Sequence, residues 1–332
     1  MTRSPAARLA LLFAALLVVG LASLMFGAVS VSPTGIVRAL LHASDEPHSM
    51  LIRNVRLPRV LLAALVGAAL SISGVLLQAF FQNPMAGPYT VGVSAGSGLL
   101  AVLVIVMGWG WVLGPFDATA LAAFLGGLLA VGLVYGIARR MRALRSEGLL
   151  LVGIAVGAVL SAFTSLLLVM SKDRAPTALF WMLGSFSSAG WRDVQMVAIL
   201  LLVSTLALVR LSRDLNLLLW GEETAASLGS PVDTVRRWVL VHSSLLAAAS
   251  VAVSGAIAYV GLMVPHIARG VMRTSDHRWV LPASIVIGAA LVLIADLIAR
   301  TVVAPIELPV GAITSLFGAP FLVYLVMRRA ER

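Results

Sequence analysis

Long uncharged apolar runs constrain the fold of this chain more than any other feature of its sequence. The run from Val60 to Phe81 has no charged residue and is long enough to cross a bilayer as a helix, which takes about 20 residues. Apolar residues fill 60% of the 332 positions and charged residues 11%. The strands of outer-membrane barrels alternate every second residue, and these runs do not. We therefore expect an all-α, polytopic membrane protein that forms one domain over residues 1–332.

The apolar runs predict about ten transmembrane helices. We place them at residues 9–30, 58–81, 90–107, 118–138, 148–170, 192–210, 237–256, 257–271, 279–300 and 310–328. The first run, 9–29, is longer than the ~7–15 residues of a signal-peptide core, so we expect an uncleaved helix. Each helix needs a bilayer around it, which makes the lipid membrane the first predicted partner.

The basic residues indicate which side of the membrane each loop faces. Ten helices put both termini on one side. If that side is the cytoplasm, sixteen of the 24 basic residues lie inside, as the positive-inside rule requires. The outer side then holds Arg38, Arg53, Arg56, Arg59, Lys172, Arg174, Arg192 and Arg300. This orientation also explains the net charge of +10, so a nucleic-acid partner is not expected.

Two short motifs indicate an inverted repeat. "ALSISG" (Ala69–Gly74) and "SVAVSG" (Ser250–Gly255) run in opposite directions across the membrane, and Pro-containing stretches, "NPMAGP" and "VPHIAR", follow them. Such repeats are common in transporters, whose pathway lies where the repeats meet. The stretch "GVSAGSG" (Gly92–Gly98) has the small-residue spacing that favours close helix packing. We interpret His266, in "VPHIAR", as a structural residue.

The source of energy is not found within the chain. A phosphate-binding loop of the GxxxxGK[ST] type needs a lysine after its second glycine, and Lys172, in "SKDR", is the only lysine. An ion-driven secondary transporter would need intramembrane carboxylates. The candidate is Asp296, but Arg300 one turn later is a ready partner for it. A partner ATPase is the simpler source, and the secondary transporter remains an alternative. A membrane enzyme would need a reactive cluster, and none is present in the sequence.

Residues 212–236 form the candidate surface for that partner. The stretch "LNLLLWGEETAASLGSP" (Leu215–Pro231) predicts two short helices separated by Gly221, the second with an acidic first turn. Leu217, Leu218, Leu219 and Trp220 are apolar residues that the topology places in water. They either mark a protein partner or pack against the helix ends of this same chain.

Several motifs together resemble the FecCD-type permeases of binding-protein-dependent ABC importers. They are "RLPRVLLAALVGAALSISGVLLQAFFQNPMAGPYTVGVSAG", "GEETAASLG", "GLMVPHIARGVMRTSDHRWVLP" and "ADLIARTVVAPIELPVGAITSLFGAPFLVYLV". "NPMAGP" departs slightly from the more usual NPLADP. The resemblance implies a ten-helix fold in the bacterial inner membrane. It implies a homodimer with two cytoplasmic ATPase subunits and a periplasmic binding protein. ATP is then used by the partner, and the chain binds no cofactor or metal and is not itself an enzyme.

The resemblance also implies roles for named residues. "GEETAASLG" becomes the segment seated in an ATPase groove, with Gly221, Glu222, Glu223, Ala225, Leu228 and Gly229 as its coupling residues. Arg56, Arg59 and Arg300 become the docking residues for acidic side chains of the binding protein, which arginine can pair bidentately. The alternative for the arginines at 53, 56 and 59 is that they anchor a helix end at lipid headgroups.

The substrate is the least constrained property. Haem and ferric siderophores both fit the resemblance, with a weak preference for haem, and cobalamin is the alternative. An iron chelate arrives with its metal already saturated, so the pathway needs width and an apolar lining more than it needs ligands. The stretch "FWMLGSF" (Phe180–Phe186) is a candidate for the outer vestibule or for an interfacial aromatic belt.

Overall fold

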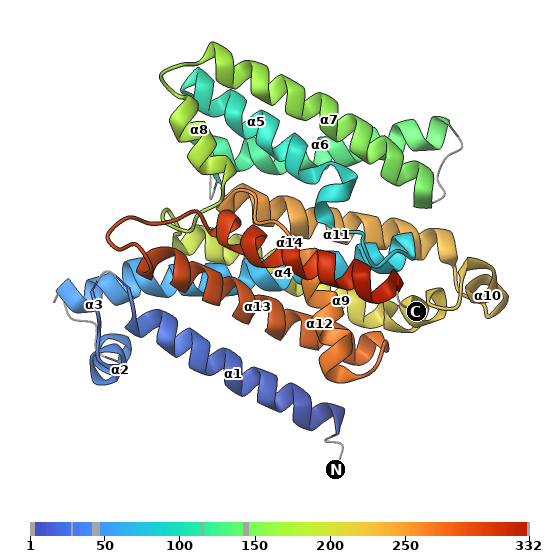
Figure 1. Ribbon diagram of the computed structural model, residues 1–332, viewed down its shortest axis with the longest axis horizontal. Coiled ribbons are helices and arrows are strands. Elements are labelled where there is room, and N and C mark those ends of the chain that lie inside the picture. The colour runs from blue at the N-terminus through green and yellow to red at the C-terminus, as the bar shows by residue number, and fades with distance from the viewer. Residues whose placement is uncertain (1–3, 28, 42–46, 114–115, 142–145, 331–332) are drawn as a thin grey trace.

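A computed structural model describes residues 4–27, 29–41, 47–113, 116–141 and 146–330. The fold is built almost entirely from helices (Figure 1). The first half contains α1 (Pro5–Met25), α2 (Pro33–Leu41), α3 (Pro47–Leu51), the π-helical turn η1 (Ile52–Arg56), α4 (Leu57–Phe81), the 3-10 turn η2 (Pro88–Val91), α5 (Val93–Met107) and α6 (Ala118–Arg140). The second half contains α7 (Ser146–Met170), α8 (Ala175–Met182), α9 (Trp191–Leu218), α10 (Glu222–Ser227), α11 (Val232–Ser254), α12 (Val260–Met272), α13 (His277–Thr301) and α14 (Val310–Ala330).

The described helices confirm the prediction of an all-α, polytopic membrane protein. Eight helical segments in the described part of the chain are long and apolar enough to span a bilayer. They are Pro5–Met25, Ser49–Phe81, Ala118–Arg140, Gly148–Met170, Trp191–Leu218, Val232–Ser254, His277–Thr301 and Val310–Arg328. The shorter apolar helices α5 and α12 occupy two further runs that were predicted to span. Two antiparallel strands of two residues each, β1 (Val112–Leu113) and β2 (Phe116–Asp117), pair just before α6.

Helix α4 lies at the centre of the molecule, and α9, α11, α12 and α13 contact it (Figure 1). Glycines allow this crowding. A Cβ built on Gly74 would lie 1.7 Å from the carbonyl oxygen of Gly261 in α12, and one on Gly67 would lie 2.2 Å from that of Gly288 in α13. Because apolar burial adds little drive in lipid, such close backbone packing is what holds transmembrane helices together.

The motifs singled out in the sequence fall at helix contacts. "ALSISG" lies in the middle of α4 and "SVAVSG" at the end of α11, and these two helices pack together. In "GVSAGSG", a Cβ on Gly96 would lie 2.3 Å from the carbonyl oxygen of Gly126, which confirms the predicted close packing of α5 on α6. His266 Nε2 donates a hydrogen bond of 2.8 Å to the carbonyl of Pro84, so it ties α12 to the "NPMAGP" turn as a structural residue.

The two ends of the bundle differ from the simple helix-and-loop expectation. We call the end that carries α10, predicted to face the cytoplasm, the inner end, and the end that carries α2, α3 and α8 the outer end (Figure 1). At the inner end α9 continues to Leu218, so the predicted short helix at its end is the last part of α9. Charged residues such as Arg210 and Asp214 end a membrane span, but they are compatible with a helix that continues into water.

Candidate functional site

The three arginines expected to dock a binding protein come together at the outer end. Arg56 belongs to η1, Arg59 to the first turn of α4 and Arg300 to the last turn of α13. They are only 5%, 8% and 6% exposed, respectively. A buried charge is costly unless it is paired. Their partners therefore decide what these residues do in the chain by itself.

Asp296 of α13 is the central partner and is fully buried. Arg59 donates from Nε and Nη2 to Asp296 Oδ1, at 3.0 and 2.9 Å. Arg300 Nε lies 3.2 Å from Asp296 Oδ2, which confirms the pairing predicted from their one-turn separation. One carboxylate therefore compensates two guanidinium groups and joins α4 to α13.

Arg56 and Arg300 also bind the end of α1. The last carbonyls of a helix have no partner within the helix and carry partial negative charge. Arg56 Nη1 donates to the carbonyls of Leu24 and Met25, at 2.8 and 3.2 Å, and Arg300 Nη2 donates to that of Ser23. The outer arginines therefore fix the first helix to α4 and α13, and simple headgroup anchoring does not describe Arg56 and Arg59.

Glu307, which the sequence analysis did not single out, completes the cluster. It lies in the connection between α13 and α14 and accepts from Arg59 Nη1 and Nη2, at 2.8 and 3.1 Å. Its side chain is 40% exposed. A bidentate arginine–carboxylate pair is the contact expected between Arg59 and an acidic partner. Here a side chain of the same protein makes that contact.

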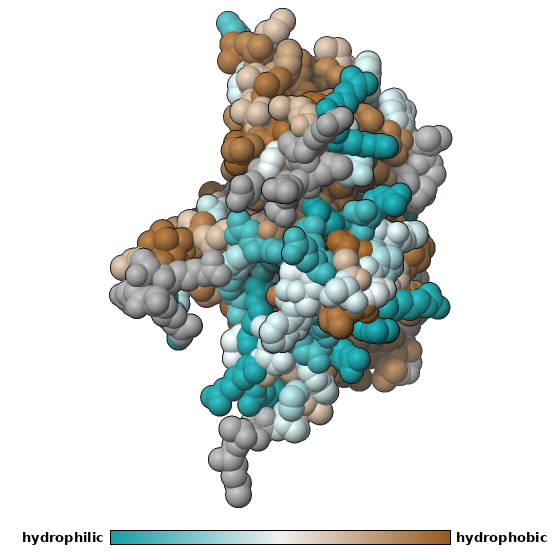
Figure 2. Space-filling view, turned by 90° about the vertical axis from the view of Figure 1, so that its right-hand side faces the viewer, coloured by the Kyte–Doolittle hydropathy of each residue, from teal (hydrophilic) through white to brown (hydrophobic). Residues whose placement is uncertain are grey.

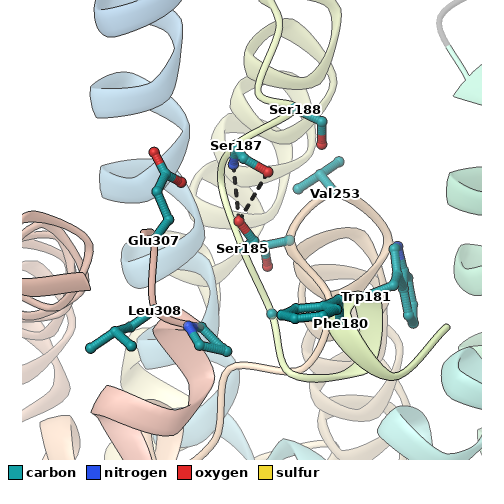
Figure 3. Close-up of a pocket in the computed structure, with 11 residues that line it drawn as sticks. Phe180, Trp181, Ser185, Ser187, Ser188, Val253, Glu307 and Leu308 are labelled. Atoms are coloured by element: carbon teal, nitrogen blue, oxygen red, sulfur yellow. Dashed lines mark hydrogen bonds between the residues drawn. The ribbon is translucent and has the colours of Figure 1, made fainter. Parts of the chain in front are cut away.

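A cavity of about 490 Å³ opens beside Glu307 at the outer end (Figure 3). Phe180 and Trp181 of α8, the serines at 185, 187 and 188, Val253 and Leu308 line it together with Glu307. Figure 3 shows Ser185 and Ser187 joined by two hydrogen bonds. The Ser185 hydroxyl donates to Ser187 Oγ and accepts from the Ser187 backbone N–H, at 3.1 Å each. The vestibule candidate "FWMLGSF" thus contributes Phe180, Trp181 and Ser185 to the lining of this cavity, whereas its last residue, Phe186, is fully buried.

The backbone around the lining serines is fixed by the neighbouring helices. Ser185 N donates to the carbonyl of Ser254 at 2.9 Å, and Val310 N donates to that of Gly184 at 2.9 Å. Gly184 has φ +79°, a conformation that favours glycine. The segment between α8 and α9 is therefore hydrogen-bonded to the outer end of α11 and the start of α14.

At the inner end, α10 forms the projecting segment predicted to couple to an ATPase. Gly221 and Gly229 bracket it with φ values of +100° and +83°, and Ala225, in the middle of α10, is fully buried. Leu219, Trp220 and Leu228 are 50%, 77% and 54% exposed. Leu218 is instead buried inside the protein. Within the apolar stretch from Leu217 to Trp220, one part therefore packs against this chain and another part is exposed.

Figure 2 shows this end, where hydrophilic residues gather across the centre with isolated hydrophobic side chains among them. Glu223 is exposed on α10, whereas Glu222 accepts a 2.7 Å bond from Arg236 of α11. The guanidinium carbon of Arg236 also lies 4.7 Å from the centre of the Phe80 ring, at the end of α4. The inner basic residues Arg3, Arg142, Arg145 and Arg332 lie outside the described residues.

Asn216, near the end of α9, connects the coupling segment to the start of α13. Its amide nitrogen donates to Asp276 Oδ1 at 2.7 Å, and its oxygen accepts from His277 N and Nδ1 at 2.9 and 2.8 Å. Burial alone would raise the pKa of Asp276. Hydrogen bonds from the Arg278 N–H and the Asn216 amide, with nearby positive charge, outweigh burial and hold that pKa below its ordinary value. This aspartate therefore stays ionised at neutral pH.

Comparison with known proteins assigns the family. Residues 15–328 match the FecCD transport family. The hemin transport system permease protein HmuU of Yersinia pestis is 38% identical, covering 99% of this chain and 97% of that protein. The cobalamin import system permease protein BtuC of Halobacterium salinarum is 42% identical, and the match covers 86% of this chain and 76% of that protein. A solved metal-chelate-type ABC transporter in an inward-facing conformation matches with a TM-score of 0.84 and 32% identity, covering 96% of this chain and 98% of the other. The chain therefore belongs to the FecCD transport family.

Proposed function

We propose that this chain is the permease subunit of an ATP-driven importer that moves an iron chelate from the periplasm to the cytoplasm. It works as a homodimer in the bacterial inner membrane, with two ATPase subunits at the inner end and a binding protein at the outer end. The observation that carries the proposal is the projecting α10 segment, with exposed Trp220 and Leu228, in a chain of the FecCD family. Exposed apolar side chains outside the membrane fit a protein partner.

Haem or a ferric siderophore is the proposed cargo. Support comes from the match with the hemin permease over 99% of this chain and from the metal-chelate type of the solved relative. The outer cavity also combines aromatic side chains with serine hydroxyls, which suits a large, partly apolar chelate. Cobalamin is the second candidate, favoured by the 42% identity to a cobalamin permease.

The proposal is tested by uptake into proteoliposomes that contain the permease, its ATPase and its binding protein. We expect chelate uptake to require ATP on the side of the membrane where the ATPase subunits are bound. Uptake should not require a proton or sodium gradient. Haem, ferric siderophores and cobalamin are offered in parallel. Leu228→Ser should weaken the association with the ATPase about tenfold, since exposed apolar side chains in an interface centre carry much of its binding energy.

Leu17→Ser on α1 is the matched control, because Leu17 is 60% exposed but lies far from α10. It should leave the ATPase association unchanged. Uptake by the permease alone, driven by an ion gradient, would favour the secondary transporter instead. Equal ATPase association in Leu228→Ser and the unmodified protein would remove "GEETAASLG" from the coupling role.

We propose further that the binding protein docks where Arg56, Arg59 and Arg300 meet, and that its acidic side chain reaches Arg59 by replacing Glu307. Support comes from the exposed side of Glu307 and from the bidentate geometry already present. Glu307→Gln should then lower the Kd of the binding protein for the permease up to about fivefold. The reason is that the substitution removes the competing, partly exposed Arg59–Glu307 charge pair, which is worth ~1 kcal/mol. The Kd is measured with the permease in nanodiscs.

Asp173→Asn is the control for this experiment, since Asp173 is an exposed acid at the same end. If any loss of negative charge at the outer end helped docking, Glu307→Gln and Asp173→Asn would lower the Kd of the binding protein equally. Unchanged or weaker binding in Glu307→Gln would contradict the exchange at Arg59. Arg59 itself is kept, because its pairing with Asp296 holds the fold together.

A further inference from the structure

Two adjoining cavities with opposite chemistry lie along α6 and α11 at the inner end, and the second is also bordered by α4 and α7. The first, about 440 Å³, is lined mainly by aliphatic side chains, among them Leu128, Val131, Val241 and Leu245. The second, about 450 Å³, is lined by Arg139, Arg236, Arg237 and Asp233, with Phe80 and Leu149. Tyr135, Arg237 and Leu240 line both, so the two cavities meet at these residues.

The order of residues along both helices separates the apolar part from the charged part. On α6, Leu128, Gly132 and Tyr135 precede Arg139 on one face, at spacings of three or four residues. On α11, which runs the other way, Arg237 precedes Val241 and Ser244. The charged part therefore lies at the inner end and the apolar part towards the middle of the bundle.

The exposure of neighbouring side chains indicates that the apolar cavity opens towards lipid. Leu129 and Leu133 of α6 are 66% and 49% exposed in a helix long and apolar enough to span the bilayer. Trp238, next to Arg237, is 50% exposed and stacks on His242 with the ring centres 5.5 Å apart. Tryptophan favours the headgroup level of a bilayer, so the arginines lie where the inner headgroups lie.

We propose that this groove binds one anionic phospholipid of the inner leaflet, with its phosphate at Arg139 and Arg237 and an acyl chain between α6 and α11. Of the three arginines that line the polar cavity, Arg236 pairs with Glu222, so the phosphate is placed at Arg139 and Arg237, and the guanidinium group pairs well with phosphate. A soluble chelate would not need the apolar extension into the bilayer, and a protein helix would not fit a cavity of this volume. Basic pockets between transmembrane helices on the cytoplasmic side suit such headgroups.

Gly132 provides the space for the acyl chain. A Cβ built at this position would meet no atom within 4 Å, although the residue lines the apolar cavity. Closer to the middle of the bundle α6 and α11 do touch, since a Cβ on Gly127 would lie 3.1 Å from that of Ala248. A leucine at 132 would therefore fill the groove without pushing the helices apart.

The test measures lipid retained by the purified permease, using native mass spectrometry. Palmitoyl-oleoyl phosphatidylglycerol and phosphatidylcholine are offered in equal amounts. We expect the unmodified protein to retain phosphatidylglycerol preferentially. The double variant Arg139→Gln with Arg237→Gln should lose that preference. The ratio of retained phosphatidylglycerol to phosphatidylcholine should fall about fivefold for each arginine removed. Arg236 is left in place because it pairs with Glu222.

Gly132→Leu should lose retention of both lipids, because it blocks the acyl-chain site and leaves the charges in place. Gly20→Leu is the matched control, since a Cβ there also meets no atom within 4 Å, on a helix remote from the groove. It should retain phosphatidylglycerol as the unmodified protein does. Equal retention of the two lipids by the unmodified protein, or an undiminished preference in the double arginine variant, would overturn the proposal. So would displacement of the bound lipid by inorganic phosphate alone, which has no acyl chain.

Discussion

Replacing Asp296 with alanine is expected to destabilise the folded permease by roughly 3–5 kcal/mol, the cost of leaving buried charges without a partner. The substitution removes the acceptor of two Arg59 hydrogen bonds and the ion-pair partner of Arg300. Both guanidinium groups would then lie close together, with only Glu307 as a carboxylate partner in the cluster. The free energy of unfolding is measured in detergent by chemical denaturation.

Asp173→Ala, at an exposed position of the outer end, removes the same charge and should change the free energy of unfolding by less than about 0.5 kcal/mol. The loss in the free energy of unfolding for Asp296→Asn should lie between those of Asp173→Ala and Asp296→Ala, because the amide oxygen can still accept a hydrogen bond from Arg59. An Asp296→Ala protein as stable as the Asp173→Ala control would mean that the cluster contributes nothing to holding α1, α4 and α13 together.

Gly74→Val is expected to prevent formation of the correctly packed bundle, at a cost of at least ~3 kcal/mol. The new Cβ would overlap the Gly261 peptide, at 1.7 Å from its oxygen and 2.4 Å from its carbonyl carbon. Backbone cannot rotate aside as a side chain does, so α4 and α12 would have to separate. The measurement is the fraction of membrane-inserted protein that elutes as a single species from size-exclusion chromatography.

Gly98→Val is the control for the added side chain. A Cβ there would meet no atom within 4 Å, although Gly98 is also a buried glycine within an apolar helix of the same half. It should elute like the unmodified protein. Equal yields of single-species protein for the variants at 74 and 98 would show that α4 and α12 are not held at this distance.

Features that depend on one helix or on neighbouring residues were predictable from the sequence. Apolar run length indicated the spans, and helical periodicity indicated that Arg300 lies on the same face as Asp296. Gly221 was expected to separate two helical pieces, and it does so with φ +100°. Glycine spacing indicated close packing, which Gly96 confirms against Gly126.

Features that depend on packing between distant segments were not predictable. Arg59 is 237 positions from Asp296, and nothing in either motif indicates that they meet. Glu307 stands alone in a proline-rich connection, and the only available sign was an acid at the same predicted end as three arginines. The inner cavities are gaps between α6 and α11, and such gaps arise from how two helices diverge. Docking, coupling and cargo recognition remain predictions.

Helix α13 is fixed at both of its ends, and this has a consequence for how the two faces of the membrane communicate. Its first residue, His277, is bound by Asn216 beside the coupling segment, whereas Asp296 and Arg300 near its last turn hold α1 and α4. Helix α13 continues through Pro282, which removes one backbone hydrogen bond near its start, and a continuous helix resists compression along its axis. We therefore expect a displacement of α9 at the inner end to move α13 along its axis and so to reach Asp296 and Arg300 at the outer end. If the proposed partner ATPase moves α9, its effect would reach the outer end through this one helix.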